Sequence, residues 1–266
     1  MRGHVHPLRG VGAVLLAAFV MSTLVGQGTS RAAEPAELLP VQGFHPLVSL
    51  DRGATGVSVI RLQYALRQQG FYRGPVDGVY GSTTESAVIT MQKYLGLDRT
   101  GDFGALDWIR IAMLPPEGIP YRWDEPDRVE IDLARQLLFV VRDHDVVGIV
   151  PTSTGSGGTY FSVRNGRDVR ATTPEGDFTL WWHQTGWNCD IITEWCVYNY
   201  WGFTSFYGIH GFRQVPPWPA SHGCSRVHTW DSDWLEGHLF VGMPIHVWSE
   251  LPEVAPKPRW NTPQML

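Results

Sequence analysis

The chain has 266 residues, more than one ordinary domain needs, and this length predicts two compact units with flanking segments. Its formal net charge is -5, and acidic and basic residues are interspersed along the chain. Because no run of Lys or Arg is present that could neutralise a row of phosphates, the composition argues against nucleic acid as a partner.

Residues 1–32 have the layout of an export signal. Arg2 and Arg9 precede an apolar run from Val11 to Val25, and Ser30-Arg31-Ala32 supplies small residues at a cleavage position. This order of charged, apolar and small residues is typical of a secretory signal peptide. An uncleaved membrane anchor is the alternative, although spanning a bilayer usually needs ~18 apolar residues. With either reading, the rest of the chain is expected to be exported, and membrane contact is expected only if the segment stays uncleaved.

The three cysteines of the chain are Cys189, Cys196 and Cys224. An odd number in an exported protein raises the question of which one stays unpaired. Cys189 and Cys196 are close enough in sequence to form a local disulfide in an oxidising compartment, which would leave Cys224 as the free thiol. The alternative, in which both are reduced and buried, stays open because sequence gives no geometry.

Residues 48–114 have a helical pattern. A first helix is indicated by apolar residues at helical spacing: Val59, Leu62 and Leu66. A second helix is predicted to begin with a capping box formed by Ser82 and Glu85 and to end at Gly96 in a left-handed cap. A third short helix is expected between Ala105 and Met113, and it is closed by the prolines that follow.

The same region carries several short motifs in a characteristic order. They are Val59-Ile60-Arg61-Leu62-Gln63, Gly70-Phe71-Tyr72, Val76-Asp77-Gly78-Val79-Tyr80-Gly81, Thr84-Glu85, Ala87-Val88 and Met91-Gln92. Together they resemble the three-helix peptidoglycan-binding domain of cell-wall enzymes. The resemblance implies that the domain binds glycan or stem peptides and targets the protein to the wall. Most of the Gly and Asp residues are expected to shape turns, so no contact is assigned to any one of them.

After a Pro-rich segment at 115–126, which is predicted to be a linker, the apolar pattern changes to strict alternation. Short apolar runs then recur at 129–133, 137–141, 146–150, 178–182 and 245–248. Short strands with turns between them predict a mainly β domain, a sandwich or barrel, at 127–249. The predicted fold class is therefore α+β multidomain, with a small three-helix domain before the β domain. Residues 33–47 and 250–266 are expected to be a linker and a tail.

Two segments carry side chains suited to covalent catalysis: Ile209-His210-Gly211 and Ser221-His222-Gly223-Cys224-Ser225-Arg226. A cysteine attacks a carbonyl as its thiolate, so it needs a base that takes the proton and forms an ion pair with the sulfur. His210 and His222 are the candidates, and the carbonyl of Gly211 is a candidate to orient His210. Gly223 allows a sharp turn at which the N–H groups of His222, Gly223 and Cys224 converge on an oxyanion.

Zinc binding is the main alternative for these side chains. His210, His222, Cys224 and His228 include both nitrogen and sulfur ligands. Their spacing matches no standard zinc pattern, so neither a metal nor another cofactor is predicted. His228 is expected to be a packing or surface residue.

The combination of His210-Gly211 with Ser221-His222-Gly223-Cys224-x-Arg226 resembles the signature of the YkuD-type L,D-transpeptidases. Upstream, three segments follow in the order of that family: Ile131 to Leu138, Thr154-Gly155 and Thr173 to Phe178. The resemblance implies that Cys224 is the nucleophile and His210 the base. It also implies that His222 and Gly223 shape the oxyanion site, and that Arg226 and Ser221 serve the substrate pocket. Ser225 departs from the pattern, because many relatives have a hydrophobic residue there.

The resemblance further implies an acyl transfer between peptidoglycan stem peptides. Cys224 would attack the carbonyl of the third residue of a tetrapeptide stem, expel the terminal D-alanine and pass the acyl group to the amine of a second stem, giving a 3,3 cross-link. Carbapenem β-lactams are expected to acylate the same thiol. Two alternatives stay open: an L,D-carboxypeptidase or endopeptidase that uses water as the acceptor, and a catalytically inert wall-binding protein.

Overall fold

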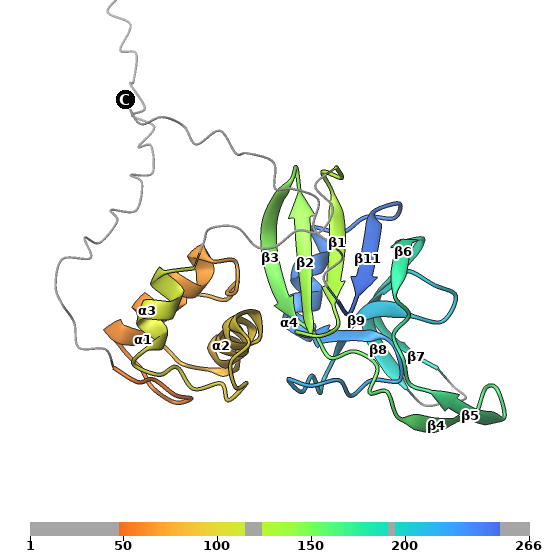
Figure 1. Cartoon of the computed structure of the whole chain (residues 1–266), viewed down its shortest axis with the longest axis horizontal. Coiled ribbons are helices and arrows are strands. Elements are labelled where there is room, and N and C mark those ends of the chain that lie inside the picture. The colour runs from red at the N-terminus through yellow and green to blue at the C-terminus, as the bar shows by residue number, and fades with distance from the viewer. Residues whose placement is uncertain (1–47, 115–123, 191–194, 251–266) are drawn as a thin grey trace, which may run out of the picture. The chain divides into compact units, whose positions relative to one another are not determined.

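The computed structural model describes residues 48–114, 124–190 and 195–250 (Figure 1). The predicted signal at 1–32, the N-terminal linker at 33–47 and nearly all of the linker and tail lie outside the described residues. Among the residues that the structure describes, none of the helices combines the length and the apolar character needed to cross a membrane.

Residues 48–114 fold into three helices, α1 (Val57–Gln68), α2 (Ser82–Leu95) and α3 (Asp107–Ala112), as predicted. Leu62, Leu66 and Met91 are fully buried between them, which confirms the predicted apolar spacing. Gly96 ends α2 with a φ of 68°, the left-handed cap that glycine adopts without a steric penalty.

The predicted capping box at the start of α2 is wrong. Gly81 occupies the cap position in extended backbone, so Ser82 lies one residue too late and no side chain caps the helix. The carboxylate of Glu85 instead accepts a hydrogen bond of 2.8 Å from Arg52.

The turn between α1 and α2 is held by one buried amide. The side chain of Gln63 donates to the carboxylate of Asp77 at 2.8 Å and to the hydroxyl of Thr84 at 3.1 Å, and its oxygen accepts from the N–H of Gly78 at 3.0 Å. Gly78 itself has a φ of 72°. The Asp-Gly motif therefore builds the turn, as expected for most of these residues.

The described residues from 124 onward form two larger sheets and one hairpin. The first sheet has the order β3-β2-β1-β11-β6, and its members are β1 (Arg128–Asp132), β2 (Leu137–Arg142), β3 (Asp145–Pro151), β6 (Gly176–Thr179) and β11 (Pro244–Trp248). The second has the order β10-β9-β8-β7, and its members are β7 (Trp182–Cys189), β8 (Cys196–Gly202), β9 (Gly208–Phe212) and β10 (Ser225–His228). The hairpin consists of β4 (Thr159–Ser162) and β5 (Arg167–Arg170). Helix α4 (Thr229–Glu236) follows β10 directly.

The two sheets share one apolar core, so the predicted sandwich is confirmed. Ile131 and Ile245 enter this core from the first sheet, and Trp201, Ile209 and Val227 enter it from the second. Most neighbouring strands are antiparallel, but β1 pairs in parallel with β11 and β9 pairs in parallel with β10.

Strand β2 is buried on both of its faces. Leu138 and Val140 belong to the core between the sheets, whereas Leu137 and Phe139 share a second core with the helices. A strand covered on both sides reads as a continuous apolar run instead of an alternating one, which accounts for the sequence Leu-Leu-Phe-Val-Val.

Lys93, on α2, also contacts the β domain, through backbone carbonyl groups next to β2 and β3. The side chain of Lys93 is 1% exposed, and its ammonium donates hydrogen bonds to the carbonyl oxygens of Gln136 at 3.0 Å and Thr152 at 2.9 Å. Burial lowers the pKa of Lys93 to about 7, and the positive charge of Arg99 acts in the same direction.

Candidate active site

The parallel pair β9 and β10 brings two of the predicted site residues, His210 and Arg226, together. His210 on β9 lies directly opposite Arg226 on β10, while their neighbours Ile209 and Val227 point into the core. Cys224 lies in the bend that leads directly into β10, two residues before Arg226, and the charge of Arg226 acts on the pKa values of both Cys224 and His210. The guanidinium of Arg226 therefore lies within electrostatic reach of both the thiol and the imidazole.

The imidazole of His210 is buried and fixed in orientation. It is 3% exposed, and its Nδ1 lies 3.1 Å from the carbonyl oxygen of Gly211, the orienting contact expected from the sequence. Because a carbonyl only accepts, Nδ1 carries the proton, and Nε2 is the nitrogen that can accept one. Burial lowers the pKa of His210 to about 4, so the ring is neutral at neutral pH.

The thiol of Cys224 is free and partly exposed. Burial of the sulfur among protein atoms raises its pKa, an effect that the N–H of Gly208 and the charge of Arg226 reduce but do not cancel. The thiol of Cys224 and the imidazole of His210 are therefore both uncharged at neutral pH. This differs from the expected ion pair, because burial penalises both charged forms.

The turn that presents Cys224 is held from inside by two hydroxyl groups. Ser221 accepts a hydrogen bond of 3.0 Å from the N–H of Gly223 and donates one to the carbonyl of Cys224. Thr173 donates a hydrogen bond of 2.7 Å to the carbonyl of Gly223. Ser221 is 2% exposed, so its hydroxyl serves the turn and not the substrate pocket, contrary to the sequence expectation.

Gly223 adopts a φ of 140°, as expected for a residue that shapes a sharp turn. Its N–H is engaged by Ser221, so it is not one of the oxyanion donors that the sequence suggested. A Cβ at this position would lie 2.2 Å from Cε1 of Tyr207 and 2.9 Å from the carbonyl oxygen of Thr172. The turn therefore requires glycine both for its backbone and for its close packing.

Replacing Gly223 by Ala is expected to cost about 1–3 kcal/mol of stability and to slow alkylation of Cys224, because the turn must move to admit the methyl group. Thermal unfolding and the rate of reaction with iodoacetamide measure the two effects. Gly157→Ala is the matched control, since Gly157 also has a positive φ, 75°, but an added Cβ there meets nothing within 4 Å. Equal effects of the two substitutions would contradict the role of close packing.

Arg226 lies beside both members of the pair. Its guanidinium carbon is 4.3 Å from the centre of the Phe212 ring, and one nitrogen donates to the carbonyl of Ala220 at 3.3 Å. The side chain is half-buried, and its charge lowers the pKa values of Cys224 and His210. Arg226 is therefore not an isolated surface charge.

His222 is held between two aromatic rings that sequence reasoning missed. The ring of Trp195 stacks on it with centroids 4.3 Å apart, and the ring of Tyr160 meets it edge-on at 4.2 Å. Trp201, which also precedes His210 in the chain, is 5% exposed and belongs to the core. No local pattern separates Trp195 from the other aromatic residues of the chain, so no signal in the sequence pointed to it.

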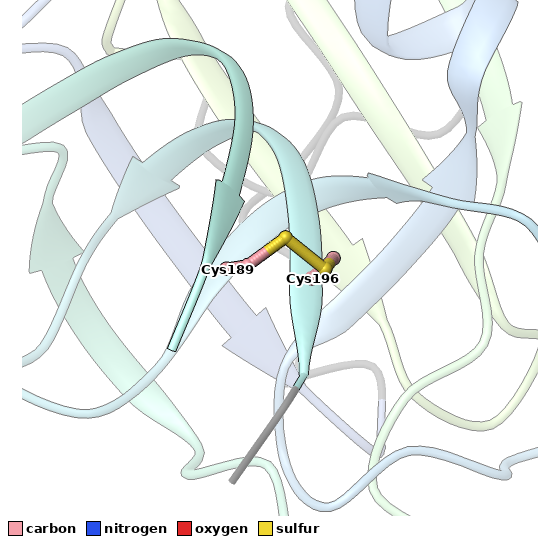
Figure 2. Close-up of a disulfide and its surroundings, with 2 residues drawn as sticks. All are labelled: Cys189 and Cys196. Carbon is pink, nitrogen blue, oxygen red and sulfur yellow. A yellow bond between two sulfur atoms is a disulfide. The ribbon is translucent and has the colours of Figure 1, made fainter. Parts of the chain in front are cut away.

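Cys189 and Cys196 form a disulfide that joins the adjacent ends of β7 and β8 (Figure 2). This decides between the two possibilities that the sequence left open. No three His, Cys, Asp or Glu side chains gather in a group that could hold a metal ion within residues 48–114, 124–190 and 195–250.

Comparison with known proteins identifies the family. Residues 55–108 match the family profile of a peptidoglycan binding domain, and residues 126–247 match the L,D-transpeptidase catalytic domain, YkuD. The solved L,D-transpeptidase of Xylanimonas cellulosilytica DSM 15894 is 34% identical, with a TM-score of 0.69 over 75% of this chain and 97% of that one. The chain belongs to the L,D-transpeptidase family. This L,D-transpeptidase is accordingly an enzyme of peptidoglycan, a polymer outside the cytoplasm.

Two curated relatives match a shorter part of the L,D-transpeptidase chain. The spore cortex-lytic enzyme of Bacillus cereus is 41% identical over 78 residues, which are 29% of this chain and 30% of that protein. The spore cortex-lytic enzyme of Bacillus subtilis (strain 168) is 48% identical over 48 residues, 18% of this chain and 16% of that protein. The chain thus spans less than a third of the length of these relatives.

Proposed function

We propose that this enzyme forms 3,3 cross-links between peptidoglycan stems through a thioester on Cys224, with His210 as the general base. The observation that carries the proposal is the register of β9 and β10. It aligns His210 with Arg226 in a strand that begins one residue after Cys224, and the charge of Arg226 acts on both the thiol and the buried imidazole, whose Nδ1 is bonded to a carbonyl.

In the first step the sulfur of Cys224 attacks the carbonyl carbon of the third stem residue. Its proton passes to Nε2 of His210, which can accept it because the ring is neutral. The carbonyl oxygen becomes an oxyanion, for which the N–H groups of His222 and Cys224 are the proposed donors. The bond to the terminal D-alanine then breaks, and the leaving amine takes the proton from His210, so that a thioester remains.

In the second step the side-chain amine of another stem attacks the thioester carbonyl. His210 takes a proton from this amine, the new amide bond forms, and Cys224 leaves and regains its proton. The charge of Arg226 next to the sulfur favours the developing thiolate at both stages. The free energy of the cleaved amide is retained in the thioester, so the exchange needs no nucleotide.

Residues 48–114 are proposed to bind peptidoglycan and to hold the catalytic part, residues 127–249, against the wall. The match of residues 55–108 to a peptidoglycan binding domain supports this. The export signal at 1–32 belongs to the same proposal, since the substrate lies outside the cytoplasm.

A purified disaccharide tetrapeptide tests the reaction. We expect the enzyme to produce cross-linked dimers and free D-alanine, and Cys224→Ala to produce neither, as measured by chromatography and mass spectrometry. Exposure to a carbapenem is expected to add one adduct to the intact mass of the wild type and none to Cys224→Ala. Shortened monomers without dimers would instead support an L,D-carboxypeptidase. Loss of both product and adduct in the wild type would support an inert wall-binding protein.

A further inference from the structure

We call residues 221–224, which present Cys224, the nucleophile turn. Two segments that lie far from it in the sequence contact its outer side through the ring of His222. His222, two residues before Cys224, has one face of its ring stacked on Trp195 at an interplanar angle of 14°. The ring of Tyr160 approaches it at 62°, and the rings of Tyr160 and Trp195 also meet, with centroids 6.1 Å apart. The three rings form one cluster, which we call the His222 clamp.

Covalent and ionic contacts hold the two partners of His222 in place. Trp195 immediately precedes Cys196, whose disulfide to Cys189 closes the loop between β7 and β8 (Figure 2). Inside that loop, the N–H of Asp190 donates to the carbonyl of Trp195 at 2.9 Å. The carboxylate of Asp190 also forms an ion pair with Arg164, which lies between β4 and β5 in the hairpin that carries Tyr160.

The clamp adds a side-chain contact to a turn whose backbone is already held by hydrogen bonds. Ser221 and Thr173 bind the backbone of the turn from within, and the side chain of His222 is what extends outward. A residue held on both sides has few conformations, and a reacting group gains rate when its position is fixed in advance. The stacked ring therefore ties the position of the sulfur to the loop that the disulfide closes.

We propose that Trp195, fixed by the Cys189–Cys196 disulfide, is a positioning residue for the nucleophile turn, and that it acts through the ring of His222. Only the expected effect of Trp195 on the acylation rate of Cys224 rests on the proposed function. The effect on His222 itself is independent of any catalysis.

The first test follows His222 by NMR, with its ring signals assigned from the spectrum of His222→Gln. Burial lowers the pKa of His222, with the charge of Arg226 as a second cause. Removing the indole in Trp195→Ala is expected to admit water, to raise the pKa of His222 toward its ordinary value, and to shift its ring protons downfield as the stacked ring current is lost. Cys189→Ser with Cys196→Ser is expected to give the same changes.

Trp187→Ala is the matched control. Trp187 belongs to the same pair of strands and is 47% exposed, as is Trp195, but its ring contacts Tyr198 and Arg213 instead. It should leave the signals of His222 unchanged. Trp195→Phe keeps an aromatic ring and is expected to restore most of the wild-type spectrum.

The second test measures the rate at which a carbapenem acylates Cys224. Trp195→Ala and the double serine variant are expected to lower this rate at least about 10-fold, about what a small displacement of a reacting group costs. Trp187→Ala should stay within about 2-fold of the wild type. Unchanged His222 signals in both Trp195→Ala and the double variant would overturn the proposal. So would changed signals at an unaltered acylation rate. A wild type that reacts with no carbapenem would defeat the proposed function, and the NMR result would still decide whether the clamp exists.

Discussion

Replacing His210 by Gln is expected to lower the rate of thioester formation at Cys224 by about 10²–10⁴-fold, with little change in KM. An amide occupies nearly the space of the imidazole but cannot take a proton from sulfur. The loss should be severe because burial raises the pKa of Cys224, so that little thiolate exists before the base acts. The measurement is the rate of D-alanine release or of carbapenem acylation.

The pH profile gives the same prediction a second readout. His210 accepts a proton only when it is neutral, and its pKa is lowered to about 4. Activity of the wild type should therefore persist through pH 6 and fall only as the pH approaches about 4. An ordinary exposed histidine would lose half of its base form near pH 6.5.

His238→Gln is the matched control for His210→Gln. The Nδ1 of His238 also lies close to a backbone carbonyl, that of Trp234, at 2.8 Å, but its ring stacks on that tryptophan at the end of α4. Its replacement is expected to leave the rate within a small factor of the wild type. A His210 variant that behaves like the His238 variant would remove His210 from the mechanism.

Replacing Lys93 by Met is expected to change how stability depends on pH. The pKa of Lys93 is about 7 in the folded protein and near 10.5 in the unfolded chain, so between these values the unfolded chain binds the extra proton. The free energy of unfolding of the wild type therefore contains a part that rises with pH across this window. Lys93→Met lacks this part. Between pH 7 and 9.5 the wild type should gain about 3 kcal/mol relative to the variant.

Urea unfolding at several pH values measures this difference. Arg99→Met is the matched control, because Arg99 also donates from the helical part to backbone carbonyls, those of Pro217 and Ala134, but its guanidinium stays charged throughout. The control should keep most of the wild-type slope, because burial is the larger cause of the lowered pKa of Lys93 and the charge of Arg99 is the smaller one. Parallel stability curves for the wild type and Lys93→Met would mean that Lys93 is not deprotonated in the folded protein.

Local features of the fold could be predicted from the sequence because their causes are local. Gly96 ends α2 and Gly223 turns the chain before Cys224, and in each case one backbone angle decides the residue type. The capping box failed for an equally local reason. Ser and Glu at the right spacing do not determine which residue occupies the N-cap position, and in α2 that residue is Gly81.

The catalytic face could be predicted in part. The spacing of His210 and Cys224 was enough to propose both residues, but their resting charges depend on burial, which only the packed structure gives. The His222 clamp could not be predicted at all. Its members come from a hairpin, a disulfide loop and the nucleophile turn, and nothing in the local pattern of Tyr160 or Trp195 separates them from the other aromatic residues.

The apolar run in β2 had the right assignment but an incomplete explanation. Its continuous apolar pattern fits a buried strand. The second face of this strand is covered by the helical part, because Leu66 and Met91 belong to the same core as Leu137 and Phe139.

Because strand β2 is buried on both faces, removing the helical part by truncation would expose one of them. A fragment that begins near residue 127 would leave Leu137, Phe139 and Ile149 facing water, and each is at most 2% exposed in the complete fold. Surfaces of this kind tend to recruit another copy or to precipitate. The helical residues 48–114 therefore also cover the apolar outer face of β2 and β3, so a fragment without them would expose that face.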